Sequence, residues 1–372
     1  MSLPLRGEGG EGRDCGEGYV QLFPNHETWD IAPMNRRLFL KICSTLIASL
    51  ASLLSLPHRL WGGFTGFSEA QPDRVVKSAG KTRVVLVRNR SVITNEGLTD
   101  STVADAMLTS AMLRLTGTTT PDKAWGELFR PEDIVGIKVN ALGGKRIATH
   151  PVVVEAITEG LKRAGVSENN IIVWDRLTDE LQKAGYVINT SGRGVRCYGT
   201  DKHYDRNPEM SGSIGSCFSN ILSSHCTAVI NVPVLKDHDL AGVSIGLKNF
   251  YGAIHNPNKY HDNNCDPFIA DLNAHPYIKD KLRLIVCDGL TLLYQGGPAY
   301  NPQHAIEYGG LLVSRDPVAL DRIGINLIEE VRKEKGLPTL KAAGREPVHV
   351  ATAAHRGLGT DDLNGIEWVK IL

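Results

Sequence analysis

Lysine and asparagine side chains recur where apolar, β-branched segments of this chain end. Lys138 and Asn140 follow such a segment, and Lys248 and Asn249 follow a Gly246-Leu247 pair that lets the backbone approach a ligand. Ammonium and amide groups donate hydrogen bonds to carboxylate and phosphate oxygens. The pattern predicts a site for a small anionic substrate, with these binding residues: Lys138, Asn140, Asn231, Lys248, Asn249 and Asp316.

Lys236 and His238 suggest acid–base chemistry beside that anion. A histidine exchanges protons near neutral pH, and a carboxylate such as Asp288 can orient it or hold a metal. We therefore predict His238, Lys236 and Asp288 as catalytic residues. The alternative is that Lys138 only extends its amine to solvent and that the three lysines are solvated and unrelated in space.

A third group of polar residues could bind a metal. His255, His261 and Cys265 lie within a dozen residues, together with carboxylates, and zinc and iron take such ligands. The spacing matches no standard metal motif, so the alternative is an ordered polar loop.

Short apolar runs alternate with helical patterns from residue 82 onward, which is typical of an α/β fold with a mostly parallel open sheet and helices on both faces. Strands are expected at 84–87, 134–139, 171–174, 228–232, 284–287 and 310–314. Helices are expected from Thr99 or Asp100 to Leu115, and from Asp316-Pro317 towards Lys335. In such sheets ligands bind at the carboxyl ends of the strands, where most of the polar residues above are expected.

The N-terminal part predicts export. Arg36 and Arg37 are followed by Leu-Phe-Leu-Lys and a mildly apolar segment, which is the pattern of a twin-arginine signal. We expect residues 1–33 to be a non-native or disordered leader, with translation starting at Met34, residues 34–70 to be the signal peptide, and residues 71–372 to form a single α/β domain. Cleavage after Ala70 would release a periplasmic protein, whereas an uncleaved signal would anchor it to the inner membrane. The twin-arginine translocase is then a partner.

The amino-acid composition limits which partners and cofactors we expect. The 41 Lys and Arg residues balance the 41 Asp and Glu residues, which argues against nucleic acid as the partner. None of the seven cysteines forms a ferredoxin-type run or a paired zinc motif. The cysteines after the signal are expected to be buried and apolar in character, with a Cys217–Cys226 disulfide as the alternative.

An ordered set of motifs resembles one known family. The motifs begin with Lys138-Val139-Asn140, continue through residues 231–238 and 246–252, and end with Asp288-Gly289, Gly297-Pro298 and residues 316–321. They resemble the Domain of Unknown Function 362 family over roughly residues 82–330, and the leader resembles that of its exported branch without a fused ferredoxin module. The resemblance implies no reaction, since that of the family is not established.

Three functions remain open from the sequence. The first is an enzyme that binds a small carboxylate or phosphate at the strand ends. The second is a metal- or cofactor-bearing periplasmic redox protein, because the twin-arginine route suits proteins that fold around a cofactor before export. The third is a non-catalytic periplasmic binding protein.

Overall fold

The computed structural model describes residues 80–94 and 96–372, so the predicted leader and signal lie outside the described residues. Its main element is a sheet in the order β12-β1-β11-β10-β7-β2-β3-β4, with β8 pairing with both β10 and β9. The strands of this sheet are β1 (Thr82–Arg88), β2 (Val135–Val139), β3 (Ile171–Asp175), β4 (Arg196–Gly199), β7 (Ala228–Val232), β8 (Val234–His238), β9 (Gly242–Ser244), β10 (Leu282–Leu293), β11 (Ala305–Ser314) and β12 (Ile366–Ile371).

The sheet is mixed but mostly parallel, which confirms the predicted fold class. Strands β10, β7, β2, β3 and β4 run parallel to one another, and β12 runs parallel to β1. Strand β11 is antiparallel to both β1 and β10. The segment 185–220, expected to hold loops or a short antiparallel addition, contributes β4 and a separate hairpin of β5 (Glu209–Ser211) and β6 (Ile214–Ser216).

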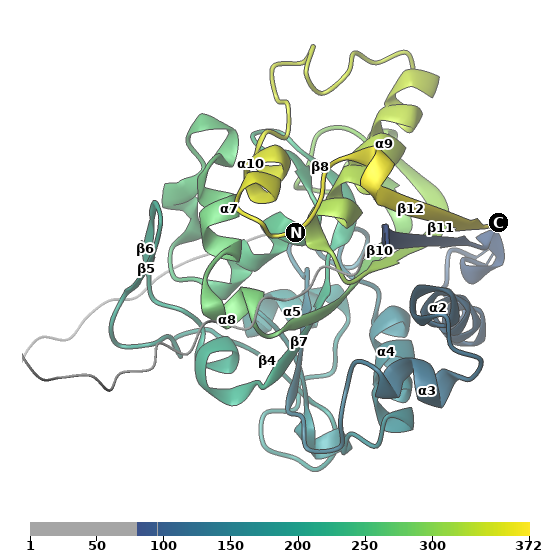
Figure 1. The fold of residues 1–372 in the computed structure, drawn as a ribbon, viewed down its shortest axis with the longest axis vertical. Coiled ribbons are helices and arrows are strands. Elements are labelled where there is room, and N and C mark those ends of the chain that lie inside the picture. The colour runs from purple at the N-terminus through teal and green to yellow at the C-terminus, as the bar shows by residue number, and fades with distance from the viewer. Residues whose placement is uncertain (1–79, 95) are drawn as a thin grey trace, which may run out of the picture. The chain divides into compact units, whose positions relative to one another are not determined.

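Helices pack on both faces of the sheet, as the alternation of side chains along a strand requires. In β1, Val84 and Leu86 join one apolar cluster, whereas Val85 and Val87 join the other. One face is covered by α2 (Ser101–Thr116), α3 (Pro121–Gly126) and α4 (Pro151–Arg163). The opposite face is covered by α6 (Gly246–Asn249), α7 (Phe268–Asn273), α8 (Pro276–Lys279), α9 (Pro317–Glu334) and α10 (His349–His355). Figure 1 shows α2, α3 and α4 together on one side and α7, α9 and α10 on the other.

Two helix starts were read correctly from the sequence. The Asp100 carboxylate accepts hydrogen bonds from the backbone of Thr102 and Val103 and so caps α2. The Asp316 carboxylate caps α9 in the same way, directly before Pro317 at the first helical position. In the described part of the chain, no helix is both long and apolar enough to cross a membrane.

Two strands differ from their predicted form. The short strand expected at 284–287 continues through Asp288 and Gly289 to Leu293, so Asp288 lies within β10 rather than after it. The strand ending at Ser314 is antiparallel to β10, so its carboxyl end lies at the opposite edge of the sheet from those of β2 and β7.

Candidate functional site

A cavity of about 360 Å³ opens beside the carboxyl ends of β2, β3 and β8. It brings together residues that lie far apart in the sequence, because parallel strands end at one edge of the sheet. Of the residues predicted to form the site, the following line it: Lys138, Asn140, Lys236, His238, Lys248, Asn249 and His261.

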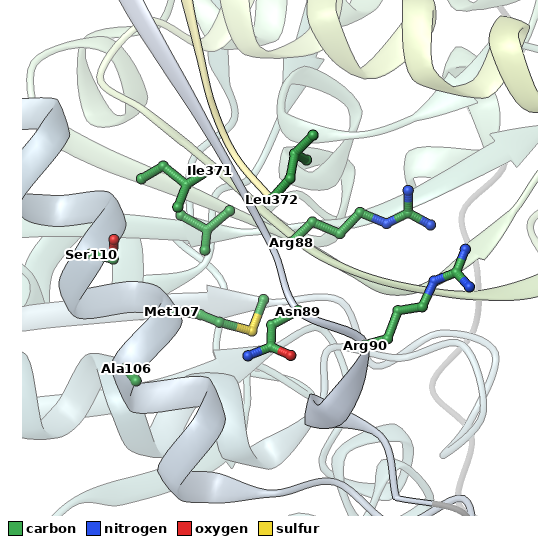
Figure 2. Close-up of a pocket in the computed structure, with 9 residues that line it drawn as sticks. Arg88, Asn89, Arg90, Ala106, Met107, Ser110, Ile371 and Leu372 are labelled. Atoms are coloured by element: carbon green, nitrogen blue, oxygen red, sulfur yellow. The ribbon is translucent and has the colours of Figure 1, made fainter.

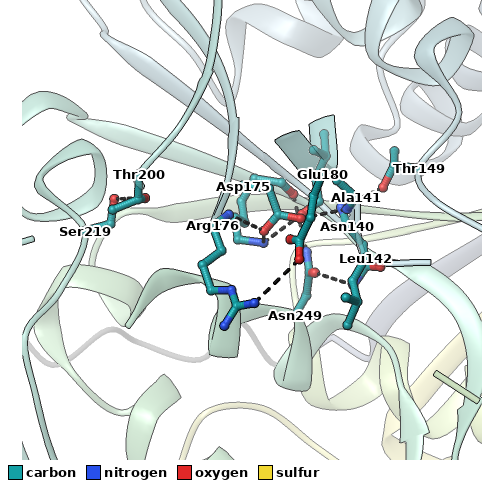
Figure 3. A network of polar contacts seen from close by, with 12 residues as sticks. Asn140, Ala141, Leu142, Thr149, Asp175, Arg176, Glu180, Thr200, Ser219 and Asn249 are labelled. Carbon is teal, nitrogen blue, oxygen red and sulfur yellow. Dashed lines mark hydrogen bonds and ion pairs between the residues drawn. The ribbon is translucent and has the colours of Figure 1, made fainter. Parts of the chain in front are cut away.

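Lys138 and Asp175 form a buried ion pair at this edge. Lys138 Nζ lies 2.7 Å from Asp175 Oδ1 and also donates to the carbonyl oxygen of Val139. The Asp175 carboxylate accepts two further hydrogen bonds, from the backbone N–H groups of Ala141 and Arg176 (Figure 3). The pair therefore ties the ends of β2 and β3 to the loops that follow them.

Gly252 packs directly against this ion pair. A Cβ atom at Gly252 would lie 2.6 Å from Asp175 Oδ1 and 2.8 Å from Lys138 Nζ. Since both polar groups are buried and already paired, they have little freedom to move away. A glycine is thus required at this close approach.

Lys236 is fully buried and its ammonium is surrounded by oxygens. Nζ donates to Asn140 Oδ1 at 2.9 Å, to the carbonyl oxygen of Leu142 at 3.0 Å and to that of Ile147 at 3.4 Å. Burial, together with the nearby Lys248 and Lys138 cations, lowers the pKa of Lys236 to about 7, whereas the Asp175 carboxylate raises it. The three oxygen acceptors match the three donors of an ammonium group, so this geometry stabilises the charged form.

A directed chain of side-chain hydrogen bonds starts at Lys236. Lys236 donates to Asn140, whose Nδ2 donates to Asn249 Oδ1 at 3.0 Å. Asn249 Nδ2 donates to Asn231 Oδ1 at 2.7 Å, and Asn231 Nδ2 donates to the carbonyl oxygen of Gly246 at 2.7 Å. Each amide is fixed by its neighbour, so Asn231 supports the site from beneath without lining the cavity.

The short helix α6 is held in place by Asp321 of α9. Its carboxylate accepts hydrogen bonds from the backbone N–H of Gly246 at 2.7 Å and of Leu247 at 3.1 Å. Burial raises the pKa of Asp321 to about 7, and the two N–H donors lower it. Asp321 thereby positions Lys248 and Asn249, which occupy the end of α6.

Lys248 is the least satisfied of the three lysines. Its Nζ lies 3.1 Å from His261 Nε2 and 4.2 Å from the centre of the Tyr251 ring. Burial lowers the pKa of Lys248 to about 8, whereas the Cys265 thiol raises it. The described residues place no carboxylate within ion-pair distance of this amine.

His238 is held as a neutral imidazole. Its Nδ1 accepts hydrogen bonds from the backbone N–H groups of Leu240 and Ala241, so the ring proton resides on Nε2. Burial and the Lys248 cation lower the pKa of His238 to about 2. Its Nε2–H is therefore a hydrogen-bond donor in the cavity.

Both carboxylates of the predicted site, Asp288 and Asp316, lie outside the cavity. Asp288 is buried within β10, where its carboxylate accepts hydrogen bonds from the backbone N–H groups of His150 and Leu290. Its Oδ2 also lies 2.8 Å from His150 Nδ1. Asp316 caps α9 and accepts a hydrogen bond from the backbone N–H of Thr360. It lies at the opposite edge of the sheet from the cavity, because β11 is antiparallel to β10. These contacts place both carboxylates in structural positions.

The predicted metal ligands do not converge. The His255 ring packs edge-on against Tyr204 at 5.3 Å, and the Cys265 thiol is buried, with Sγ 4.0 Å from the carbonyl oxygen of His261. His261 uses both ring nitrogens, Nδ1 towards Pro257 and Nε2 towards Lys248. Over residues 80–94 and 96–372, no three His, Cys, Asp or Glu side chains are grouped to hold a metal ion, so the geometry does not fit the predicted metal site. The described cysteines, including Cys217 and Cys226, are all free thiols.

Four charged or aromatic residues that line the cavity were missing from the predicted set. They are Asp175 at the end of β3, Arg176 in the loop that follows, Glu180 of α5 (Thr178–Ala184), and Tyr251. Asp175 and Arg176 directly follow a predicted strand, which is the same signal that identified Lys138. Figure 3 shows Arg176 reaching Glu180, at 3.5 Å, beside the Asp175 carboxylate.

Positive charge predominates in the cavity. Four cationic side chains and two carboxylates line it, and burial together with Asp175 raises the pKa of one of those carboxylates, Glu180. The cations are Lys138, Arg176, Lys236 and Lys248. An anion entering the cavity would therefore be attracted.

A larger hollow of about 590 Å³ lies elsewhere, between α2 and the end of the chain at Leu372. Figure 2 shows Arg88 and Arg90 extending beside it. Arg90 is exposed, and Arg88 donates to the carbonyl oxygen of Tyr308. None of the predicted site residues lines this hollow.

The fold and the cavity define an α/β protein with a lysine-rich site at the carboxyl edge of its sheet. The family model for the domain of unknown function DUF362 matches residues 135–326, and the chain belongs to this family. The matched segment contains the cavity residues from Lys138 to Pro298.

Comparison with solved structures gives a partial similarity to a bacterial protein. A Thermotoga maritima protein of known crystal structure is 12% identical, with a TM-score of 0.38. The match covers 57% of this chain and 58% of that protein. No curated protein matches the sequence.

Proposed function

We propose that this protein is an enzyme that binds a small carboxylate or phosphate in the cavity at the carboxyl edge of the sheet. The observation that carries the proposal is the convergence of Lys138, Lys236 and Lys248 on one cavity with a positive excess. Lysines near an anion provide charge-assisted hydrogen bonds, which are about twice as strong as neutral ones.

The hydrogen bonds of the three lysines suggest different roles. Lys236 uses its N–H groups within the protein, so it holds Asn140 and the surrounding loop. Lys138 and Lys248 have fewer internal acceptors and can donate to a ligand. The Nε2–H of His238 adds a neutral donor suited to an oxygen that gains negative charge during a reaction.

Ligand-induced stabilisation tests the proposal. The melting temperature is measured with a panel of carboxylates and phosphates at about 10 mM, since a ligand that binds only the folded state raises it. We expect a shift with at least one anion and its loss in Lys248→Met. The matched control is Lys333→Met, because Lys333 is exposed on α9 outside the cavity. Lack of any shift across the panel would contradict the proposal.

Turnover separates an enzyme from a binding protein. Each anion that raises the melting temperature is incubated with the protein, and its conversion is followed by NMR. We expect conversion that is lost in His238→Gln while anion binding remains. Binding without conversion of any ligand would instead support a non-catalytic periplasmic binding protein.

We also propose export through the twin-arginine translocase, on the basis of Arg36 and Arg37. The protein would then act in the periplasm or at the outer face of the inner membrane. Replacing both arginines by lysine should retain the protein in the cytoplasm, as measured by cell fractionation. Unchanged export of this variant would contradict the proposal.

A further inference from the structure

Lys248 differs from the other two lysines of the cavity in its surroundings. Lys138 has a carboxylate partner in Asp175, and Lys236 has three oxygen acceptors. Lys248 has one nitrogen acceptor, His261 Nε2, and an aromatic face, that of Tyr251. Burial of an ammonium without an anionic partner shifts its equilibrium towards the neutral amine.

The contact with His261 gives the amine a proton acceptor. His261 Nδ1 lies 3.2 Å from the carbonyl oxygen of Pro257, which can only accept, so the ring proton is on Nδ1. The Nε2 lone pair therefore faces Lys248 Nζ at 3.1 Å. This arrangement allows a proton to pass between the amine and the imidazole.

Burial keeps part of the amine neutral and therefore reactive. Lys138 and Lys236 line the same cavity. With a pKa of about 8, roughly a tenth of Lys248 is neutral at neutral pH, far more than for an ordinary lysine. The remaining N–H of Lys138 and the Arg176 guanidinium are available to bind an anion nearby.

We propose that Lys248 is a nucleophile that forms a Schiff base with a small oxo acid. This proposal rests on the proposed function, because the carboxylate of the oxo acid is the anion that the cavity binds. It adds a carbonyl group as the second feature of the substrate. The cavity of about 360 Å³ suits a molecule of this size.

The reaction takes up one proton from water in addition to the amine and the oxo acid. The Nζ lone pair of Lys248 attacks the carbonyl carbon, and the carbonyl oxygen takes up this proton to become a hydroxyl group. The nitrogen loses one proton to His261 Nε2, which returns it to the hydroxyl group as water leaves. The product is a protonated C=N bond at Lys248 and one molecule of water.

Reductive trapping tests the proposal. The purified protein is incubated at about pH 8, near the pKa of Lys248, with pyruvate, 2-oxoglutarate or glyoxylate and sodium cyanoborohydride. The products are analysed by intact mass and peptide mapping. We expect a single secondary amine at Lys248, formed at least about tenfold faster than at the exposed Lys333. Equal labelling of both lysines, or no labelling of Lys248, would overturn the proposal.

Variants separate nucleophilic attack from simple charge. Lys248→Arg keeps a cation but has no amine, so it should still show an anion-dependent melting shift yet form no adduct. His261→Asn should slow adduct formation while Lys248 remains the labelled residue. If Lys248→Arg does not fold, this second variant still provides the test, since an unchanged trapping rate in His261→Asn would contradict the role of His261.

The outcome also distinguishes this proposal from the proposed function. Acids without a carbonyl group, such as lactate and succinate, are tested in parallel for the melting shift. A shift with these acids, but no adduct with any oxo acid, would refute the Schiff base and leave the anion site intact. Absence of any shift would refute the anion site itself.

Discussion

Lys138 Nζ lies 2.7 Å from Asp175 Oδ1, and this buried pair joins the carboxyl ends of the adjacent parallel strands β2 and β3. Both side chains are removed from solvent, so each compensates the desolvation of the other. The pair sits in the wall of the cavity and connects the stability of the sheet edge to the geometry of the site.

Removing one partner of this pair should be strongly destabilising. We expect Asp175→Asn or Lys138→Met to lower the free energy of unfolding by about 3–5 kcal/mol, because each leaves a buried group without its partner. Urea unfolding measures the change. The double variant should lose less than the sum of the two single losses.

The exposed pair Lys183–Asp179 on α5 is the matched control. Its removal should change the free energy of unfolding by no more than about 0.5 kcal/mol. If Asp175→Asn costs as little as Asp179→Asn, the Lys138–Asp175 pair is not a stabilising element.

Gly252 should not tolerate a methyl group. Gly252→Ala places a Cβ within 3 Å of both Asp175 and Lys138, so it should cost about 1–3 kcal/mol of stability and weaken anion binding. Gly126→Ala is the control, because a Cβ there would meet no atom within 4 Å. Equal melting temperatures for the two variants would show that the ion pair can move aside.

Much of the cavity could be predicted from the sequence for a simple reason. Parallel strands end at one edge, so Lys138 and Asn140 at one strand end were expected to lie near Asn231 and Lys236 at another. The hydrogen-bond chain from Lys236 to Asn231 agrees with this expectation.

Other features depend on contacts that a local pattern does not contain. A parallel strand ending at Ser314 would bring Asp316 to the site, whereas β11 pairs antiparallel with β10. The apolar run that stops at Cys287 predicts a strand end before Asp288, whereas hydrogen bonds to β11 continue the strand to Leu293. Asp321 lies in a helical pattern, and only the packing of α9 against α6 brings it to Gly246.

Anion binding should weaken as the pH rises through about 8. The folded pKa of Lys248 is lowered from its usual value to about 8, so its charge is present below that pH and is lost above it. Where this charge contributes to binding, affinity should fall by up to about tenfold per pH unit above the pKa. Titration calorimetry between about pH 6 and about pH 9.5 measures the profile.

Lys248→Met provides the comparison for this pH profile. The variant should bind more weakly near neutral pH, and its affinity should no longer fall above about pH 8. A decline of the same steepness in Lys248→Met would assign the titration to another group, such as Lys236.

His349 should make the protein sensitive to acid. Its ring is fully buried in α10, and neither nitrogen has a hydrogen-bond partner among the described residues. Burial and the Lys248 cation lower its pKa to about 3, whereas an unfolded histidine titrates near 6.5. As the pH falls below about 6.5, the unfolded state gains a proton that the folded state does not, so stability decreases.

His349→Leu should reduce this dependence by up to about 1.4 kcal/mol per pH unit, because it removes one linked proton. It should also raise stability at low pH, since no polar ring is left unsatisfied. Urea unfolding at several pH values provides the measurement, with the exposed His225→Leu as the control. Identical slopes for wild type and His349→Leu would contradict this assignment.

Because each hydrogen bond in the chain from Lys236 to Asn231 has a fixed direction, Asn249→Asp is a sensitive test of the site. Asn249 Nδ2 donates to Asn231 Oδ1 at 2.7 Å, and Asn231 cannot turn its amide because Nδ2 is held by the carbonyl oxygen of Gly246. An aspartate at position 249 would place two oxygens against each other in a buried position. We expect a loss of about 1–3 kcal/mol in the free energy of unfolding.

The same substitution should affect the anion site. Asn249 also fixes Asn140, which accepts from Lys236, so Asn249→Asp should abolish the anion-dependent rise in melting temperature. Asn364→Asp is the control, because Asn364 is exposed and lies outside the cavity. If Asn249→Asp instead matches Asn364→Asp in both stability and anion response, the hydrogen-bonded asparagines do not hold the lysines in place. Asp175 and Asp321 alone would then fix the positions of Lys138 and Lys248.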